Sequence, residues 1–152
     1  MKENEKIVWS DDYKLGLDIV DAQHKHLFIL VNKLYALEDD SENLKENIKQ
    51  ILYTFSNYMK THFKDEEDYM HSIGYPDIEK HKAHHNKLIE MLTKLIQTPA
   101  KLTIVKTKMK LIAKKALIEH ITKEDMKIKL YLLSLDKNIS HLDEEIFEIK
   151  NV

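Results

Sequence analysis

The chain has 152 residues, a mass of 18.1 kDa and 43% apolar composition, which suits one domain with a single core. Two glycines, two prolines and no cysteine exclude a turn-rich β-sandwich or barrel and every thiolate site. All 24 basic residues are lysine and 26 acids outnumber them, which argues against a nucleic-acid partner. The charged first ten residues and the lack of a long apolar run predict a soluble cytoplasmic protein with no membrane association.

The first half of the chain predicts two helices, because apolar residues recur there at three- and four-residue spacing. The first helix covers about residues 19–38, with Asp18 or Asp21 as its N-cap. The cap-forming run at 38–41 interrupts the pattern. A second, longer helix then covers about residues 42–70.

The second half predicts two more helices. Gly74 and Pro76 form the connection, with Pro76 suited to the first turn of a third helix that starts near residue 78 and ends at Thr98 before Pro99. The fourth helix runs from about Val105 to Leu135. Residues 136–138 stop it, and the last dozen residues form a short terminal segment that contains Ile146, Phe147 and Ile149.

Four amphipathic helices with short links predict an all-α protein, an up-down-up-down antiparallel four-helix bundle with a short N-terminal arm and a C-terminal segment. We expect residues 1–152 to form a single domain. In this topology, the start of the first helix, the end of the second, the start of the third and the end of the fourth all lie at one end of the bundle.

Several positions on the apolar stripes carry imidazole or carboxylate groups instead. They fall at the four helix segments that share one end of the bundle, at a similar depth, so their side chains are expected to converge in the core. The residues are His24, His62, Glu66, His81, His85, His120 and Asp125.

These buried groups need partners, because an unpaired polar or charged group in the core is costly. Five imidazoles with two carboxylates are too many for one four-coordinate zinc ion, and among redox metals this ligand type suits iron. Two irons bridged by Glu66, Asp125 and one solvent-derived group fit the count. Three histidines on one iron and two on the other leave one coordination position open.

The spacing of His120 and Asp125 is irregular for such a site. Residues five apart cannot both point straight inward from an ideal α-helix. A local π-type turn would bring them together; alternatively, the carboxylate bridges from the side and needs no such turn.

Four motifs resemble those of the hemerythrin family in spacing, order and helix placement. The resemblance extends to the segment Val8–Ser10, as in bacterial members, and to the 70–76 connection, so it spans nearly the whole chain and points to the stand-alone bacterial form. The motifs are DAQHK at 21–25, HFKDEE at 62–67, His81-x-x-x-His85 and His120-x-x-x-x-Asp125.

The resemblance implies a non-haem di-iron centre, bridged by carboxylates and an oxo or hydroxo group, that binds dioxygen reversibly for carriage, storage or delivery without acting as an enzyme. By family pattern, His81, His85 and His120 hold the coordinatively filled iron, whereas His24 and His62 hold the iron with the open position. Dioxygen is the expected ligand. An oxygen-consuming protein is the kind of partner that this role suggests, and the sequence does not identify it.

Leu27, Phe63 and Leu117 lie one helical step from ligands. We interpret them as the apolar wall that keeps water from bound oxygen, and the alternative is that they are ordinary core residues. Ferritin-like di-iron oxidases are a poorer match, because they use Glu-x-x-His twice and no histidine here has a glutamate three residues before it. Oxygen or redox sensing, or iron handling, at the same site remains the alternative function.

Four histidines fall outside this set. We expect His26 to face solvent and His84 to lie at the surface, with a position at the edge of the site as its alternative. His71 and His141 lie at helix ends, where a cation near the C-terminal dipole explains them.

Overall fold

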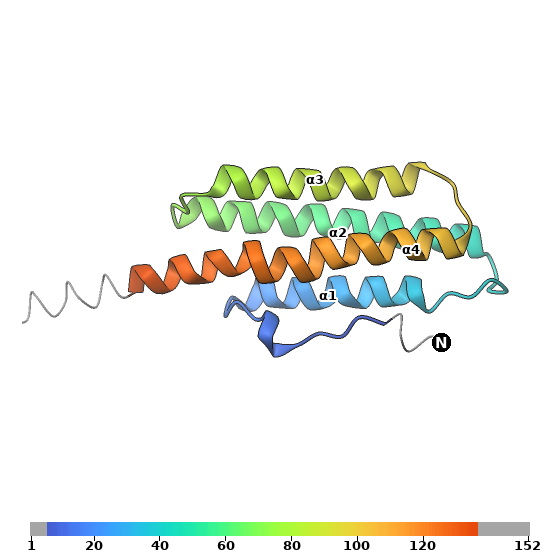
Figure 1. The fold of residues 1–152 in the computed structure, drawn as a ribbon, viewed down its shortest axis with the longest axis horizontal. Coiled ribbons are helices and arrows are strands. Elements are labelled where there is room, and N and C mark those ends of the chain that lie inside the picture. Colours follow the sequence, from blue (N-terminus) through green and yellow to red (C-terminus); the bar gives the residue numbers. More distant parts are fainter. Residues whose placement is uncertain (1–5, 137–152) are drawn as a thin grey trace, which may run out of the picture.

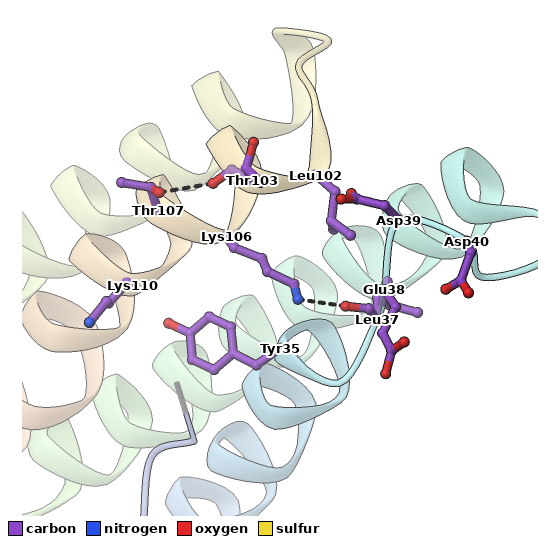
Figure 2. A pocket seen from close by; sticks show the side chains of 10 residues that line it. All are labelled: Tyr35, Leu37, Glu38, Asp39, Asp40, Leu102, Thr103, Lys106, Thr107 and Lys110. Atoms are coloured by element: carbon purple, nitrogen blue, oxygen red, sulfur yellow. Dashed lines mark hydrogen bonds between the residues drawn. The ribbon is translucent and has the colours of Figure 1, made fainter. Parts of the chain in front are cut away.

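A computed structural model describes residues 6–136 of the chain. Four helical rods lie side by side in it, and the described residues contain no strand (Figure 1). This confirms the predicted all-α four-helix bundle. The helices are α1 (Asp18–Tyr35), α2 (Leu44–Ser72), α3 (Ile78–Gln97) and α4 (Leu102–Ala113), and the last continues into the π-helix η3 (Lys114–Asp125) and an α-helical stretch over 126–136.

The helices pack in the expected antiparallel order. α1 contacts α2, α2 contacts α3, and α4 closes the bundle against α3 and α1. The fourth rod begins at Leu102, three residues before the predicted start at Val105. α1 stops at Tyr35 instead of near residue 38, because the Ser41 hydroxyl accepts the Glu38 N–H and stabilises a turn there.

The N-terminal arm lies against α1 and contains the short 3-10 helix η2 (Asp11–Tyr13). Asn32 holds the arm by accepting the Ile7 N–H and donating to the Ile7 carbonyl, both at 2.9 Å. The predicted cap was wrong: neither Asp18 nor Asp21 is the N-cap of α1, which is Leu17 and has no side-chain cap bond.

Asp21 has a different role from capping. It lies in the first turn of α1, and its buried carboxylate accepts the Leu15 N–H at 2.8 Å and the Gly16 N–H at 3.2 Å. The carboxylate thus accepts N–H groups of the N-terminal arm and not of the helix that it was predicted to cap. Asp21 fastens the end of the arm to the same helix that carries His24.

The α2–α3 connection is set by a glycine. Gly74 has φ +67°, in the left-handed region, and the Tyr75 N–H bonds back to the Met70 carbonyl at 2.9 Å to close the end of α2. Pro76 does not enter α3, which starts two residues later at Ile78, so its predicted place in the first turn was wrong. The tight turn sets the end of α2 beside the start of α3.

The core is one large apolar cluster through the bundle plus a smaller one near its end. Four of its most deeply buried side chains come one from each helix. They lie seven to eleven residues along the chain from the nearest of the seven predicted site residues, and we call them the apolar layer: Leu34, Phe55, Leu92 and Met109. The smaller cluster joins Met70, Tyr75 and Ile128.

No helix within residues 6–136 is both long enough and apolar enough to cross a bilayer. The terminal segment with Ile146, Phe147 and Ile149 lies outside the described residues.

Candidate metal centre

The structure brings all seven polar residues of the apolar stripes together. Each has a side chain that is at most 4% exposed, and Asp125 and Glu66 are fully enclosed. We call this set the metal layer: His24 from α1, His62 and Glu66 from α2, His81 and His85 from α3, and His120 and Asp125 from η3.

The spacing of His120 and Asp125 is accommodated by a π-helix. η3 is twelve residues long and contains both ligands, and its wider turn brings the His120 Nε2 to 3.0 Å from the Asp125 Oδ1. Of the two alternatives that the sequence left open, the π-type geometry is the one observed. It extends well beyond the single local turn that the spacing required.

The candidate ligand atoms form two groups, and the atoms of each group lie within 4.8 Å of one another. The first group contains three histidines, the second contains two, and both carboxylates belong to both groups. The three-histidine position comprises His81, His85 and His120 with Glu66 and Asp125; the two-histidine position comprises His24 and His62 with the same carboxylates.

Each carboxylate offers one oxygen to each position. The Glu66 Oε1 lies 2.7 Å from the His81 Nε2 and 3.1 Å from the His85 Nε2, while its Oε2 lies 3.4 Å from the His62 Nε2. Asp125 repeats the arrangement, with its Oδ1 at 2.9 Å from the His81 Nε2 and its Oδ2 at 3.1 Å from the His24 Nε2. This division of oxygens is the arrangement that two carboxylate bridges between two metal ions require.

Several of these buried atoms lack a hydrogen-bond partner despite their proximity. They are the His24 Nε2, the Glu66 Oε2 and both oxygens of Asp125. The Asp125 Oδ2 lies only 3.1 Å from the His24 Nε2, yet the two atoms do not meet at a hydrogen-bonding angle. Lone pairs that converge without a shared proton fit a metal ion, which satisfies all of them at once.

The protonation equilibria of the cluster show how strongly it attracts positive charge. Burial acts to raise the pKa of Asp125, but the neighbouring His120 holds that pKa well below its usual range. Burial likewise acts to lower the pKa of His81, but the adjacent carboxylates of Asp125 and Glu66 raise it to about 9. The carboxylates therefore stay ionised in the core, where the neighbouring imidazoles compensate their charge.

Two ligands are oriented by neighbours that the sequence analysis did not assign. The His62 Nδ1 lies 2.6 Å from the Gln23 Oε1, and the His85 Nδ1 lies 2.8 Å from the Glu67 Oε2. Each acceptor holds the proton on Nδ1, so the Nε2 lone pair points into the metal layer. In the sequence, Gln23 is next to His24 and Glu67 is next to Glu66. Their contacts with His62 and His85 depend on how the helices pack, so the sequence alone does not show them.

The three predicted wall residues are all buried in the main core cluster. Phe63 is the best placed: its ring stacks on His85 at 3.8 Å between centroids and 6° between planes. The centroid of the same ring lies 5.7 Å from that of the His62 ring, so Phe63 neighbours histidines of both metal positions. Leu27 and Leu117 are each 1% exposed.

Three further histidines of the described residues are not part of the ligand set, although the ring centroid of one of them, His84, lies 6.4 Å from that of His120. His26 does not simply face solvent, because its half-buried ring packs 4.3 Å from that of Tyr58. His84 is at the surface, as expected, with its Nε2 3.8 Å from the Glu124 carboxylate, and His71 is exposed in the last turn of α2. His141 lies outside the described residues.

Fold and site together define a helical-bundle protein with a buried, two-position, histidine- and carboxylate-lined candidate metal centre. Residues 15–132 match the hemerythrin HHE cation binding domain. The chain is 35% identical over 132 residues to a bacteriohemerythrin of Campylobacter jejuni (strain 81-176), a match that covers 86% of this chain and 95% of the relative. The chain therefore belongs to the hemerythrin family, as the motif resemblance predicted.

Two further bacteriohemerythrins match part of the chain. The protein of Clostridium acetobutylicum is 36% identical over 85 residues, which is 55% of this chain and 66% of the relative. That of Pseudomonas aeruginosa (strain PAO1) is 29% identical over 87 residues, or 57% of this chain and 56% of the relative.

Proposed function

We propose that this protein binds dioxygen reversibly at two iron ions held in the metal layer. The observation that carries the proposal is the unequal division of ligands: both positions share Glu66 and Asp125, but one has three histidines and the other has two. The two-histidine position therefore has one protein ligand fewer, and a small ligand can bind there.

The iron ions would supply the two electrons that dioxygen takes up on binding and returns on release. The protein's own task is to hold the ions and limit side reactions. His24 and His62 would supply nitrogen to the ion at the position with fewer protein ligands, and Glu66 and Asp125 would hold both ions. The His62 Nδ1 faces the Gln23 Oε1 at 2.6 Å, on the side of the ring away from the metal layer.

We further propose that Leu27, Phe63 and Leu117 exclude water from the oxygen site. Water and acids speed the irreversible loss of bound oxygen, so a dry and apolar wall prolongs the oxygenated state. The support is strongest for Phe63, whose ring touches histidines of both positions. For Leu27 and Leu117 the support is their nearly complete burial beside ligand-bearing turns.

Binding without turnover is the better proposal for this ligand set. The centre contains two carboxylates and five imidazoles, whereas ferritin-like di-iron proteins place additional carboxylates around their metals. A histidine-rich set is less suited to high-valent iron. We therefore propose an oxygen-binding protein that serves an oxygen-consuming partner, not an oxygenase.

Metal analysis with an optical spectrum tests the proposal. We expect about two irons per chain and, in air, a visible absorption band that bleaches when oxygen is removed and returns when it is readmitted. A band that does not respond to oxygen, or turnover of an added organic substrate, would contradict it.

Replacement of His62 sharpens the test. His62→Ala removes a nitrogen from the two-histidine position only, so the variant should keep the first iron and lose reversible oxygenation. His71→Ala is the matched control, because His71 is an exposed histidine on the same helix. Normal oxygenation with two irons in His62→Ala would show that the assignment is wrong.

A further inference from the structure

We propose that Asp65, an exposed residue that touches no ligand, is a positioning residue for the two-histidine metal position. It acts through the Gln23 side-chain amide and fixes which ring nitrogen of His62 carries the proton. The inference rests on the proposed metal centre but not on oxygen binding.

Three side chains form the chain of contacts. The Gln23 Nε2 donates to the Asp65 Oδ2 at 2.9 Å, and the Gln23 Oε1 faces the His62 Nδ1 at 2.6 Å. On the other side of its ring, the His62 Nε2 faces Glu66 in the metal layer. The contacts span α1 and α2 and run from the surface to the core.

The direction of these bonds follows from the chemistry of the groups. A side-chain amide has a donor end and an acceptor end, and it can turn over to present either one. An ionised carboxylate only accepts, so Asp65 must face the NH₂ end of Gln23. The amide oxygen is then directed at His62, whose Nδ1 must carry the proton.

The consequence concerns metal binding. A neutral imidazole has one protonated nitrogen and one with a free lone pair, and only the second can bind a metal ion. With the proton on Nδ1, the Nε2 of His62 is available. If Gln23 turned over, its NH₂ end would face Nδ1, the proton would move to Nε2, and His62 could not ligate.

The three-histidine position does not need such a relay. His85 is oriented directly by the carboxylate of Glu67, which has no donor end to present. The two-histidine position has a neutral amide in the corresponding place, so its orientation depends on a third residue. This difference makes Asp65 the residue on which the availability of His62 depends.

Reversal of the charge at position 65 tests the relay. In Asp65→Lys the new ammonium only donates, so it should pair with the Gln23 oxygen and turn the NH₂ end toward His62. In metal-free protein at pH 8, ¹⁵N NMR of the ring nitrogens should show His62 protonated on Nδ1 in the wild type and on Nε2 in the variant. Asp68→Lys is the control: it makes the same charge change on the exposed face of α2, where Asp68 pairs with Lys64.

A second substitution should reverse the effect. Glutamate at position 23 has acceptor oxygens only, so the double variant Asp65→Lys with Gln23→Glu should pair the new charges and return the His62 proton to Nδ1. A merely structural role of Asp65 predicts no such rescue, because the double variant departs further from the natural sequence.

Anaerobic titration with Fe²⁺ gives the second readout. Loss of an outer partner of a metal-binding histidine weakens binding by about 10- to 100-fold. We expect that loss for the second equivalent of Fe²⁺ in Asp65→Lys, no change for the first, and recovery in the double variant.

A wild-type His62 tautomer and undiminished binding of both ions in Asp65→Lys would overturn the inference, as would an equal effect in Asp68→Lys. The proposed function fails separately: a wild type that never oxygenates refutes oxygen binding, while the metal-free NMR comparison still decides the role of Asp65.

Discussion

The metal layer and the apolar layer lie on the same four helical rods, but one consists of polar, ionisable side chains and the other of hydrophobic side chains. The apolar layer has Leu34, Phe55, Leu92 and Met109 in a continuous hydrophobic cluster. The metal layer is buried just as deeply but contains seven imidazoles and carboxylates, several without a hydrogen-bond partner.

The two layers therefore contribute to stability in different ways. Burial of apolar side chains stabilises the first layer by itself. The second layer carries groups that are costly to bury and are compensated when cations bind them. Equally buried layers of one bundle therefore contribute differently to the free energy of unfolding. The apolar side chains packed around the metal layer stabilise the helices that carry its residues.

Removal of the metal is expected to have the largest effect, and it concerns the metal layer alone. A ligand that binds only the folded state at 1,000 times its Kd stabilises that state by about 4 kcal/mol, and the proposed centre would bind two ions. Denaturation of metal-free and iron-loaded protein should thus differ by about 4 kcal/mol or more in the free energy of unfolding. Equal stabilities would mean that the layer does not hold metal ions in its core.

Leu92→Ala tests the apolar layer. Leu92 is fully buried, so its truncation should lower the free energy of unfolding by about 2–5 kcal/mol. The loss should be the same with and without iron, and the iron content and optical spectrum should not change. A variant that loses iron in proportion to its stability would show that the two layers are coupled.

Leu117→Ala makes the same chemical change beside the metal layer. Leu117 is 1% exposed and lies one turn before His120, so a similar loss of about 2–5 kcal/mol is expected. The two leucine variants should differ in oxygen chemistry: with iron content unchanged, the oxygenated spectrum should decay faster in Leu117→Ala because the new cavity admits water. An identical decay in both variants would place Leu117 in the ordinary core.

Asp21→Ala should give the smallest effect. The substitution leaves the N–H groups of Leu15 and Gly16 without their acceptor, at a cost of about 1–3 kcal/mol. The same loss is expected in metal-free and loaded protein, because Asp21 holds the arm and does not touch the centre. A loss seen only in the loaded form would assign Asp21 to the metal layer.

The sequence was sufficient to predict the bundle and its seven convergent residues. Apolar periodicity locates the helices. A polar residue such as His24 or Glu66 on the apolar stripe of a helix predicts a buried side chain that belongs to a binding site. These features are local and periodic, so one chain reveals them. The spacing of His120 and Asp125 predicted a π-type turn only as one of two alternatives, and the structure shows that one.

Features that depend on how helices rotate against each other were not predictable. Asp21 looked like a cap by its position, but the arm folds back so that its carboxylate meets Leu15 instead. Gln23 and Glu67 sit in the quoted motifs with no sign of which nitrogen they would face. Such contacts join residues 39 and 18 positions apart, and periodicity contains no information about them.

The twelve-residue π-helix also fixes the rotation of everything that follows it. A π-helix bonds residues five apart instead of four, so it takes up more residues per turn than an α-helix. Residues 126–136 leave it at an angle about the helix axis that presents Ile128 to Met70 and Tyr75. Deletion of one residue between His120 and Asp125 would let that pair share one face of an ordinary α-helix, and Ile128, three residues after Asp125, would keep its direction relative to the pair. Insertion of one residue there would instead turn both Asp125 and Ile128 away from the directions that they now share with His120 and with Met70. We therefore expect this segment to tolerate a one-residue insertion less well than a one-residue deletion.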